Sequence, residues 1–182
     1  MADRIALQQF QDELARKLAA VAQRPQAVRW LGVSWQGVRA LLPLAQAGEI
    51  SQPMPLQRLP HTQPWVVGVA SLRGVLTLVV DWVQLLDVAG DAQGSGSEQF
   101  YWVSLNADFH VGAALCVDQL LGLHTGQAWQ VAAVPQGMHP AIRQIWHDEQ
   151  GQPWYELDLQ AVVDAPAFQD PGASGFPANP EA

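Results

Sequence analysis

Few side chains in this chain could do chemistry. Glu156 and Asp158 stand two residues apart in a strand-like segment, so they would share one face and could form an acid–base pair. Nothing around them completes a mechanism, and we interpret both as solvated surface. The single thiol, Cys116, lies inside an apolar strand pattern and is interpreted as a small core residue rather than a nucleophile.

The sequence also lacks motifs that would bind a metal ion or a phosphate group. The five histidines have neither a His-x-His nor a His-Glu-x-x-His spacing, and no Gly-Lys-Ser/Thr phosphate loop occurs. Asp81 ends an apolar strand, as a phospho-accepting aspartate would, but that chemistry also needs a lysine after a later strand. The chain's one lysine, Lys17, precedes all the strands. The sequence therefore predicts a protein that is not an enzyme and holds neither a cofactor nor a metal.

Composition narrows the class of protein and of partner. Up to Arg73 there are eight Lys/Arg and four Asp/Glu residues, whereas from Gly74 onward there is one against thirteen. An acidic second half argues against nucleic acid. No apolar run approaches the roughly 20 residues that span a bilayer, Met1 to Phe10 carry no apolar signal core, and a lone cysteine fits a reducing compartment. We expect a cytoplasmic protein without direct membrane insertion.

Residues 64–82 contain the most informative pattern. Two apolar runs flank Arg73-Gly74, and Arg73 is the one charged residue between Trp65 and Val80. Runs of this kind broken by glycine predict two strands joined at a tight corner. An arginine at so apolar a corner needs a carboxylate partner or open solvent.

The remaining elements follow from periodicity. Residues 5–23 predict one amphipathic helix within an N-terminal segment 1–27, and 28–88 predict about five strands and a short helix from Trp82 capped by Asp81. A Gly/Ser-rich linker, 90–97, precedes further strands, and the strand-Asp-helix ending at Asp81 recurs at Asp158. Residues 166–182, rich in Pro and Gly, predict a disordered tail.

Three motifs resemble CheW-like scaffold domains. Gly68-Val-Ala-Ser-Leu-Arg-Gly74 precedes an apolar strand that ends in Asp81; Gly48-Glu-Ile50 precedes a proline-rich stretch; and 110–123 resembles the strand of the second half. The resemblance covers roughly residues 29–163. The chain departs from the pattern at Ser71, where Asn is usual, and at Trp82, where Leu is usual.

The resemblance implies a mainly β fold of two intertwined five-stranded SH3-like barrels over residues 28–165, with halves at about 28–89 and 98–165. It implies a non-enzymatic adaptor between the cytoplasmic tip of a methyl-accepting chemoreceptor and the regulatory domain of a CheA-like histidine kinase, recruited to membrane-associated receptor arrays. The N-terminal helix and tryptophan-rich opening resemble the PilI-like branch, which serves type IV pilus twitching motility.

Matched residue by residue, Arg73 is the motif arginine and Glu49, followed by Ile50, is the motif glutamate; Leu44 and Ala47 fall where the family's kinase-facing apolar residues lie. Whether Arg73 and Glu49 brace each other or contact a receptor stays open. Two alternatives also stay open: a CheW-like adaptor in another signalling pathway, and a β-barrel that binds a small ligand in a tryptophan-lined pocket.

Overall fold

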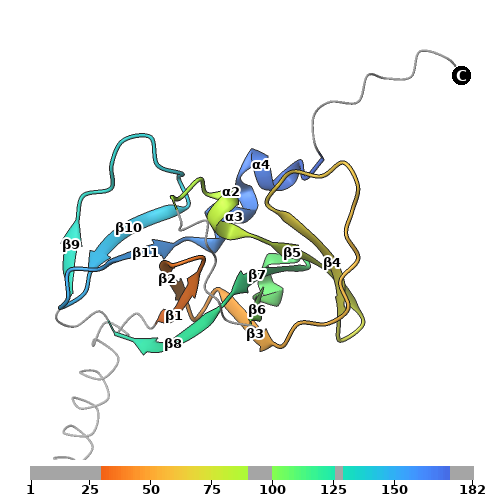
Figure 1. The fold of residues 1–182 in the computed structure, drawn as a ribbon, viewed down its shortest axis with the longest axis horizontal. Coiled ribbons are helices and arrows are strands. Elements are labelled where there is room, and N and C mark those ends of the chain that lie inside the picture. The colour runs from red at the N-terminus through yellow and green to blue at the C-terminus, as the bar shows by residue number, and fades with distance from the viewer. Residues whose placement is uncertain (1–29, 90–99, 126–128, 173–182) are drawn as a thin grey trace, which may run out of the picture.

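The computed structural model describes residues 30–89, 100–125 and 129–172, which form two mixed β-sheets (Figure 1). The first sheet has the strand order β8-β1-β2-β11-β10-β9 and the second has the order β3-β6-β7-β5-β4. The bounds in the first sheet are β1 Trp30–Trp35, β2 Val38–Pro43, β8 Gln119–His124, β9 Gln130–Ala132, β10 Ile142–His147 and β11 Pro153–Leu157. Those in the second are β3 Ala47–Ser51, β4 Val66–Leu72, β5 Val75–Val80, β6 Tyr101–Leu105 and β7 Ala113–Val117.

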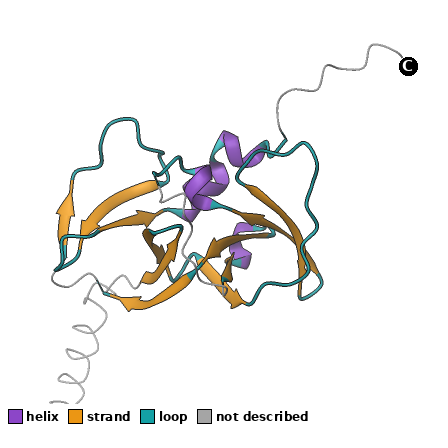
Figure 2. Cartoon of the chain, in the orientation of Figure 1, coloured by secondary structure: helices purple, strands orange, loops and turns teal. Residues whose placement is uncertain are grey.

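Three short helices lie together between the sheets, α2 (Trp82–Leu85), α3 (Leu159–Asp164) and α4 (Pro166–Gln169), and a 3-10 turn, η1 (Ala107–Phe109), joins β6 to β7 (Figure 2). None of the helices within the described ranges is long and apolar enough to cross a membrane. The mainly β fold class is confirmed, although one sheet has six strands where five were expected.

Each sheet combines strands from both sides of the 90–97 linker, so the expected halves 28–89 and 98–165 do not each build one sheet. In the first sheet β2 pairs with β11 in parallel, and in the second β5 pairs with β7 in parallel. The physical reason is that the tight β1–β2 and β4–β5 hairpins leave one edge of β2 and of β5 open to a strand that comes later in the chain. The linker is therefore not a domain boundary.

Both hairpins use the same kind of corner. Gln36 and Gly37 have φ values of 51° and 78°, and Arg73 and Gly74 have φ values of 49° and 83°. Positive φ at both central residues is the pattern of a type I′ turn, whose twist matches that of the flanking strands. Gly74 is thus required by backbone conformation, while Arg73 accepts a conformation that few side chains favour.

The main hydrophobic core joins the two sheets and the helices, with residues such as Val33, Leu115, Trp82 and Leu157 at 0% exposure. Polar contacts also cross between the sheets: in the β1–β2 turn, Gln36 donates from its backbone N–H to Asp118 (2.9 Å) and from its side chain to Asp81 (2.7 Å). The two sheets therefore share one core and are joined by polar contacts as well.

All eight tryptophans lie within the described residues, and none is fully exposed. Five of the eight are buried and the other three are half-buried against the core clusters: the buried ones are Trp30, Trp65, Trp82, Trp102 and Trp154, and the half-buried ones are Trp35, Trp129 and Trp146. Cys116 is a core residue, as predicted. Burial, with the nearby charge of Asp81, raises the pKa of its thiol to about 12.

The two predicted helix caps are confirmed. Asp81 accepts a hydrogen bond from Gln84 N (3.1 Å) at the start of α2, and Asp158 accepts from Gln160 N (3.0 Å) at the start of α3. The interpretation of Glu156 as solvated surface is wrong, because it is 6% exposed on β11 and accepts from the indole of Trp146 at 2.8 Å. Asp158 lies beyond the end of that strand, so the two carboxylates have separate structural roles.

The predicted N-terminal helix and the 90–97 linker lie outside the described residues. The predicted disordered tail is wrong in its first part, because residues 166–169 form α4 and Phe168 is buried. The Phe168 ring stacks on Trp65 with centroids 5.9 Å apart. Packing of this aromatic ring holds the proline-containing segment against the core.

Candidate adaptor groove

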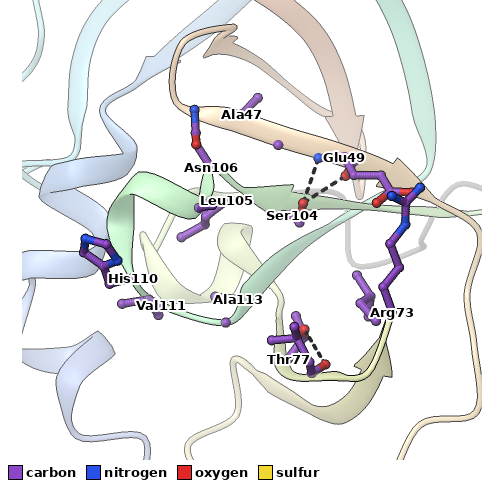
Figure 3. A pocket seen from close by; sticks show the side chains of 15 residues that line it. Ala47, Glu49, Arg73, Thr77, Ser104, Leu105, Asn106, His110, Val111 and Ala113 are labelled. Atoms are coloured by element: carbon purple, nitrogen blue, oxygen red, sulfur yellow. Dashed lines mark hydrogen bonds and ion pairs between the residues drawn. The ribbon is translucent and has the colours of Figure 1, made fainter.

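An open groove of about 690 Å³ lies on the second sheet beside the Arg73-Gly74 corner (Figure 3). One wall comes from β3, a second from the β4–β5 hairpin, and a third from η1 and the residues that lead into β7. Backbone and apolar side chains make up most of the lining, which comprises Ala47, Gly48, Glu49, Leu72, Arg73, Val75, Thr77, Ser104, Leu105, Asn106, Ala107, His110, Val111, Gly112 and Ala113.

An ion pair crosses one side of the groove. Arg73 extends from the hairpin corner toward β3, and its Nη2 lies 2.7 Å from Oε1 of Glu49 (Figure 3). The Arg73 side chain is 81% exposed and that of Glu49 is 44% exposed. Water and salt therefore screen the pair, which contributes at most about 1 kcal/mol to stability. The structure thus brings the two groups into contact, which is one of the two roles that the sequence left open for them.

Contacts between β3 and β6 fix the position of Glu49. The Ser104 hydroxyl accepts from Glu49 N (2.8 Å) and donates to Glu49 O (3.2 Å). At Gly48 an added Cβ would lie 2.6 Å from Ser104 Oγ and 2.7 Å from Leu105 O, so only glycine permits this close approach. The carboxylate of Glu49 is thus presented on a backbone held at two points.

The opposite wall is equally well fixed. Asn106 donates from its side chain to Ala45 O (2.9 Å) and accepts from Asp108 N (3.2 Å), which ties η1 to the β2–β3 turn. His110 caps η1 in the left-handed region with φ of 53° and exposes its side chain at the rim. The floor continues into Ala113, which is 2% exposed. A preformed wall of this kind lowers the entropy cost of binding.

Large apolar side chains are exposed at Val75 in the groove lining and at the neighbouring strand positions of two lining residues. Val75 is 58% exposed, Leu76 is 71% exposed, and Ile50 on β3 is 41% exposed. Val75 and Leu76 follow directly after the Arg73-Gly74 corner. Apolar side chains grouped with a charged pair beside a groove are typical of a protein-binding surface.

The structure places three of the five predicted site residues in the groove, and Ile50 and Leu44 are not part of its lining. Ala47, Glu49 and Arg73 line the groove, and Ile50 follows next to Glu49 on β3. Leu44 lies in the turn before β3, half-buried against the main core, so little of it faces outward.

Sequence reasoning missed the wall formed by Ser104, Asn106 and His110. These residues reach the groove through the pairing of β3 with β6, two strands about fifty residues apart in the chain. No local signal marks that pairing.

Some polar side chains of the groove are already paired within it. Its charged side chains neutralise each other, and Thr77 donates to the nearby carbonyl of Val75 at 3.1 Å. Within the described part of the chain, no group of three or more His, Cys, Asp or Glu side chains is placed to hold a metal ion.

Comparisons with known proteins agree with this fold. The chain is 26% identical over 167 residues to protein PilI of Pseudomonas aeruginosa (strain PAO1), an alignment that covers 87% of this chain and 90% of that protein. Its structure superimposes on the scaffolding protein TtCheW from Thermoanaerobacter tengcongensis with a TM-score of 0.63 at 13% identity, covering 80% of this chain and 93% of that one. The sequence profile of the CheW-like domain matches residues 29–167, and the chain therefore belongs to the CheW-like domain family.

Proposed function

We propose that this protein is a non-enzymatic adaptor that couples a chemoreceptor to a histidine kinase in a chemosensory system for type IV pilus twitching. The family match over residues 29–167 supports the adaptor role, and the similarity to PilI along most of the chain supports the pilus branch. We further propose that it acts in the cytoplasm and is recruited to receptor arrays at the membrane.

The groove beside Arg73 is the observation that carries the receptor part of the proposal. Its apolar lining suits the hydrophobic side chains of a receptor tip, and Glu49 and Arg73 offer both signs of charge at the entrance. Because each group already has its partner, a receptor must either exchange that ion pair or add to it. Such an exchange favours a charged partner over an apolar competitor.

Leu44 and Ala47, the predicted kinase-facing residues, expose less of their side chains than Arg73 and Glu49 do. Both side chains are half-buried, Leu44 against the core and Ala47 at the end of the groove. We propose that they contribute the edge of a kinase contact that includes exposed parts of β3. Receptor and kinase would then bind side by side, so that each could change the affinity for the other.

An adaptor of this kind works only through unequal binding. It shifts the kinase between inactive and active states to the extent that it binds one state more tightly than the other. A difference of about 1.4 kcal/mol would change the population ratio tenfold. No group on this chain needs to react.

Capture of the two partners by single-residue variants tests the proposal. The receptor's cytoplasmic tip and the kinase regulatory domain from the same organism are each mixed with wild type, Arg73→Ala and Glu49→Ala. Arg143→Ala on β10 serves as the matched control, since Arg143 is an exposed arginine on the other sheet. We expect Arg73→Ala to weaken receptor capture about tenfold, Glu49→Ala to weaken it less, and Arg143→Ala to leave it unchanged.

Two results would contradict parts of the proposal. Receptor capture equal to wild type in both groove variants would remove the groove assignment. Failure of wild type to capture either partner would remove the coupling role. Tryptophan fluorescence quenched by a metabolite without any protein partner would then favour the small-ligand barrel, and capture of a different signalling enzyme would favour an adaptor in another pathway.

A further inference from the structure

A second exposed apolar surface lies on β8, away from the groove. Leu123 is 66% exposed and Leu120 is 38% exposed. Their Cα partners on β1 are Leu31 and Val33, which belong to the main core. Both leucines therefore stand on the core-facing side of the first sheet but beyond the part of the core that is covered.

The same face continues along β1 to its far end. Side chains alternate along a strand, so Trp35 shares the face of Leu31 and Val33. Trp35 contacts Phe100, whose ring centroid lies 6.4 Å away and whose side chain is 38% exposed. We call Leu123, Leu120 and Phe100 the β8 strip. Trp35 lies four strand positions beyond Leu31, which gives the strip a length of about 13 Å.

β8 is an edge strand that lacks the usual protection. Among the described residues it pairs with β1 alone, and its sequence, Gln-Leu-Leu-Gly-Leu-His, contains neither a carboxylate nor a lysine or arginine. Proteins blunt such edges with charges, with proline or with a covering segment. An uncharged, leucine-rich edge beside an exposed apolar strip needs a cover.

The chain has a segment of the right kind at the right place. Residues 5–23 predict a helix whose apolar side recurs at three- and four-residue steps, at Leu7, Phe10, Leu14, Leu18 and Val21. The fifteen residues from Leu7 to Val21 would extend about 21 Å as a helix, enough to cross the strip. Pro25 ends the helical pattern.

The start of the described chain lies beside the strip, within reach of that segment. Trp30, the first described residue, has His124 as its Cα partner, immediately beside Leu123. The six residues 24–29 can reach about 20 Å, which is ample for a return over β8. A tether this short also gives the segment a high effective concentration at β8, which a second copy of the chain lacks.

Charge favours the same arrangement. Residues 1–29 carry five Lys/Arg and three Asp/Glu, whereas the described residues carry four Arg and eleven Asp/Glu. A net positive segment on a net negative body is attracted rather than repelled.

We propose that residues 5–23 fold back as an amphipathic helix and seat Leu7, Phe10, Leu14, Leu18 and Val21 on the β8 strip. The helix closes the edge of the first sheet within the same molecule. None of the three residues of the β8 strip lines the groove, so this surface is separate from the proposed receptor site.

Disulfide trapping in the full-length chain tests the proposal. Leu14→Cys is combined with Leu123→Cys; the native Cys116 stays in place because it is buried and its raised pKa keeps it unreactive. Each of two controls changes one of the two cysteine positions. Arg16→Cys with Leu123→Cys uses the opposite side of the predicted helix. Leu14→Cys with Leu76→Cys uses an exposed leucine of the other sheet. We expect the first pair to form an intramolecular disulfide about tenfold faster than either control.

Each outcome has a definite meaning. A fast disulfide within the monomer supports the docked helix. A disulfide-linked dimer would show that a second copy occupies the strip, and a rate equal to both controls would show that residues 5–23 do not dock there; either result overturns the proposal.

Thermal melting gives an independent readout. Deletion of residues 1–24 should lower the melting temperature of wild type but lower it less in a Leu123→Ser background, because both changes remove the same contact. Val131→Ser, at a residue 63% exposed on β9, is the matched background in which the full effect of the deletion should persist. Equal effects in all three backgrounds would contradict the proposed seat.

Discussion

Arg73 lies 2.7 Å from Glu49, yet most of its side chain is open to solvent. An exposed pair of this kind adds little to stability, so a binding defect in Arg73→Ala would report lost contact with a partner rather than unfolding. Gly74 differs, because its φ of 83° is needed to close the hairpin. At this corner the glycine stabilises the turn and the arginine is available for recognition.

Asp148 is the residue for which a pH dependence can be predicted. Burial alone would raise the pKa of Asp148, but hydrogen bonds from the Trp154 indole and from the backbone of Gln152 and Gln150, with the charge of Arg39, outweigh it and lower the pKa. The stability this gives is fully present above the ordinary aspartate pKa of about 3.9. It is lost as the pH falls through the lower folded-state pKa.

Asp148→Asn should therefore cost about 1 kcal/mol of unfolding free energy at pH 7. The difference from wild type should shrink as the pH falls below about 4. Urea denaturation at several pH values measures it, with Asp108→Asn as the control because Asp108 is exposed in η1. A difference between wild type and Asp148→Asn that stays constant down to pH 2.5 (roughly 1.4 units below the ordinary aspartate pKa) would disprove the assigned cause.

At the scale of elements, the two capping aspartates have unequal surroundings. Asp81 is 3% exposed and accepts from Gln36 Nε2 and Gln84 Nε2, each at 2.7 Å, in addition to capping α2. Asp158 caps α3 and accepts from Gln46 at 3.2 Å in a half-buried position. Asp81→Ala should cost about 2–4 kcal/mol and Asp158→Ala about 0.5–2 kcal/mol. Chemical denaturation of both variants measures this, and a larger loss for Asp158→Ala would contradict the assigned roles.

The helix α4 leads to a prediction about truncation. A chain that ends at Ala165 loses the buried Phe168 and the bond from Gln63 N to Pro171 O at 2.9 Å. We expect it to lose about 2–4 kcal/mol of unfolding free energy. A chain that ends at Gly172 keeps both contacts and should stay within about 0.5 kcal/mol of the full chain. Equal melting of the two truncated chains would show that α4 does not contribute.

Local signals made the elements predictable and long-range pairing made the rest unpredictable. The hairpin at Arg73-Gly74 and the caps at Asp81 and Asp158 each depend on residues within a few positions of each other. The groove forms only because β3 pairs with β6, and each sheet includes strands from both sides of the 90–97 linker. Phe168 was missed for the same reason, since its partner Trp65 lies about a hundred residues earlier.

For the molecule as a whole, the parallel pairs β2–β11 and β5–β7 join strands from before and after residue 90 in both sheets. The main core is equally shared, with Leu42 and Val80 from before residue 90 and Leu115 and Leu157 from after it. An isolated first half would keep the β1–β2 hairpin without the four strands that complete its sheet. A two-stranded hairpin is at best marginally stable alone.

Fragments cut in the 90–97 linker should therefore not fold separately. We expect residues 1–93 and 94–182, expressed apart, to show no cooperative thermal transition by circular dichroism, because each lacks part of both sheets and of the shared core. Mixed in equal amounts, the fragments should recover one transition below that of the intact chain, since association of two chains costs entropy that the linker spares. The chain cut at the same point after folding serves as the control and should melt like the mixture. A cooperative transition in either fragment alone would mean that the halves are independent domains after all, and the exchange of strands between the sheets would then be incorrect.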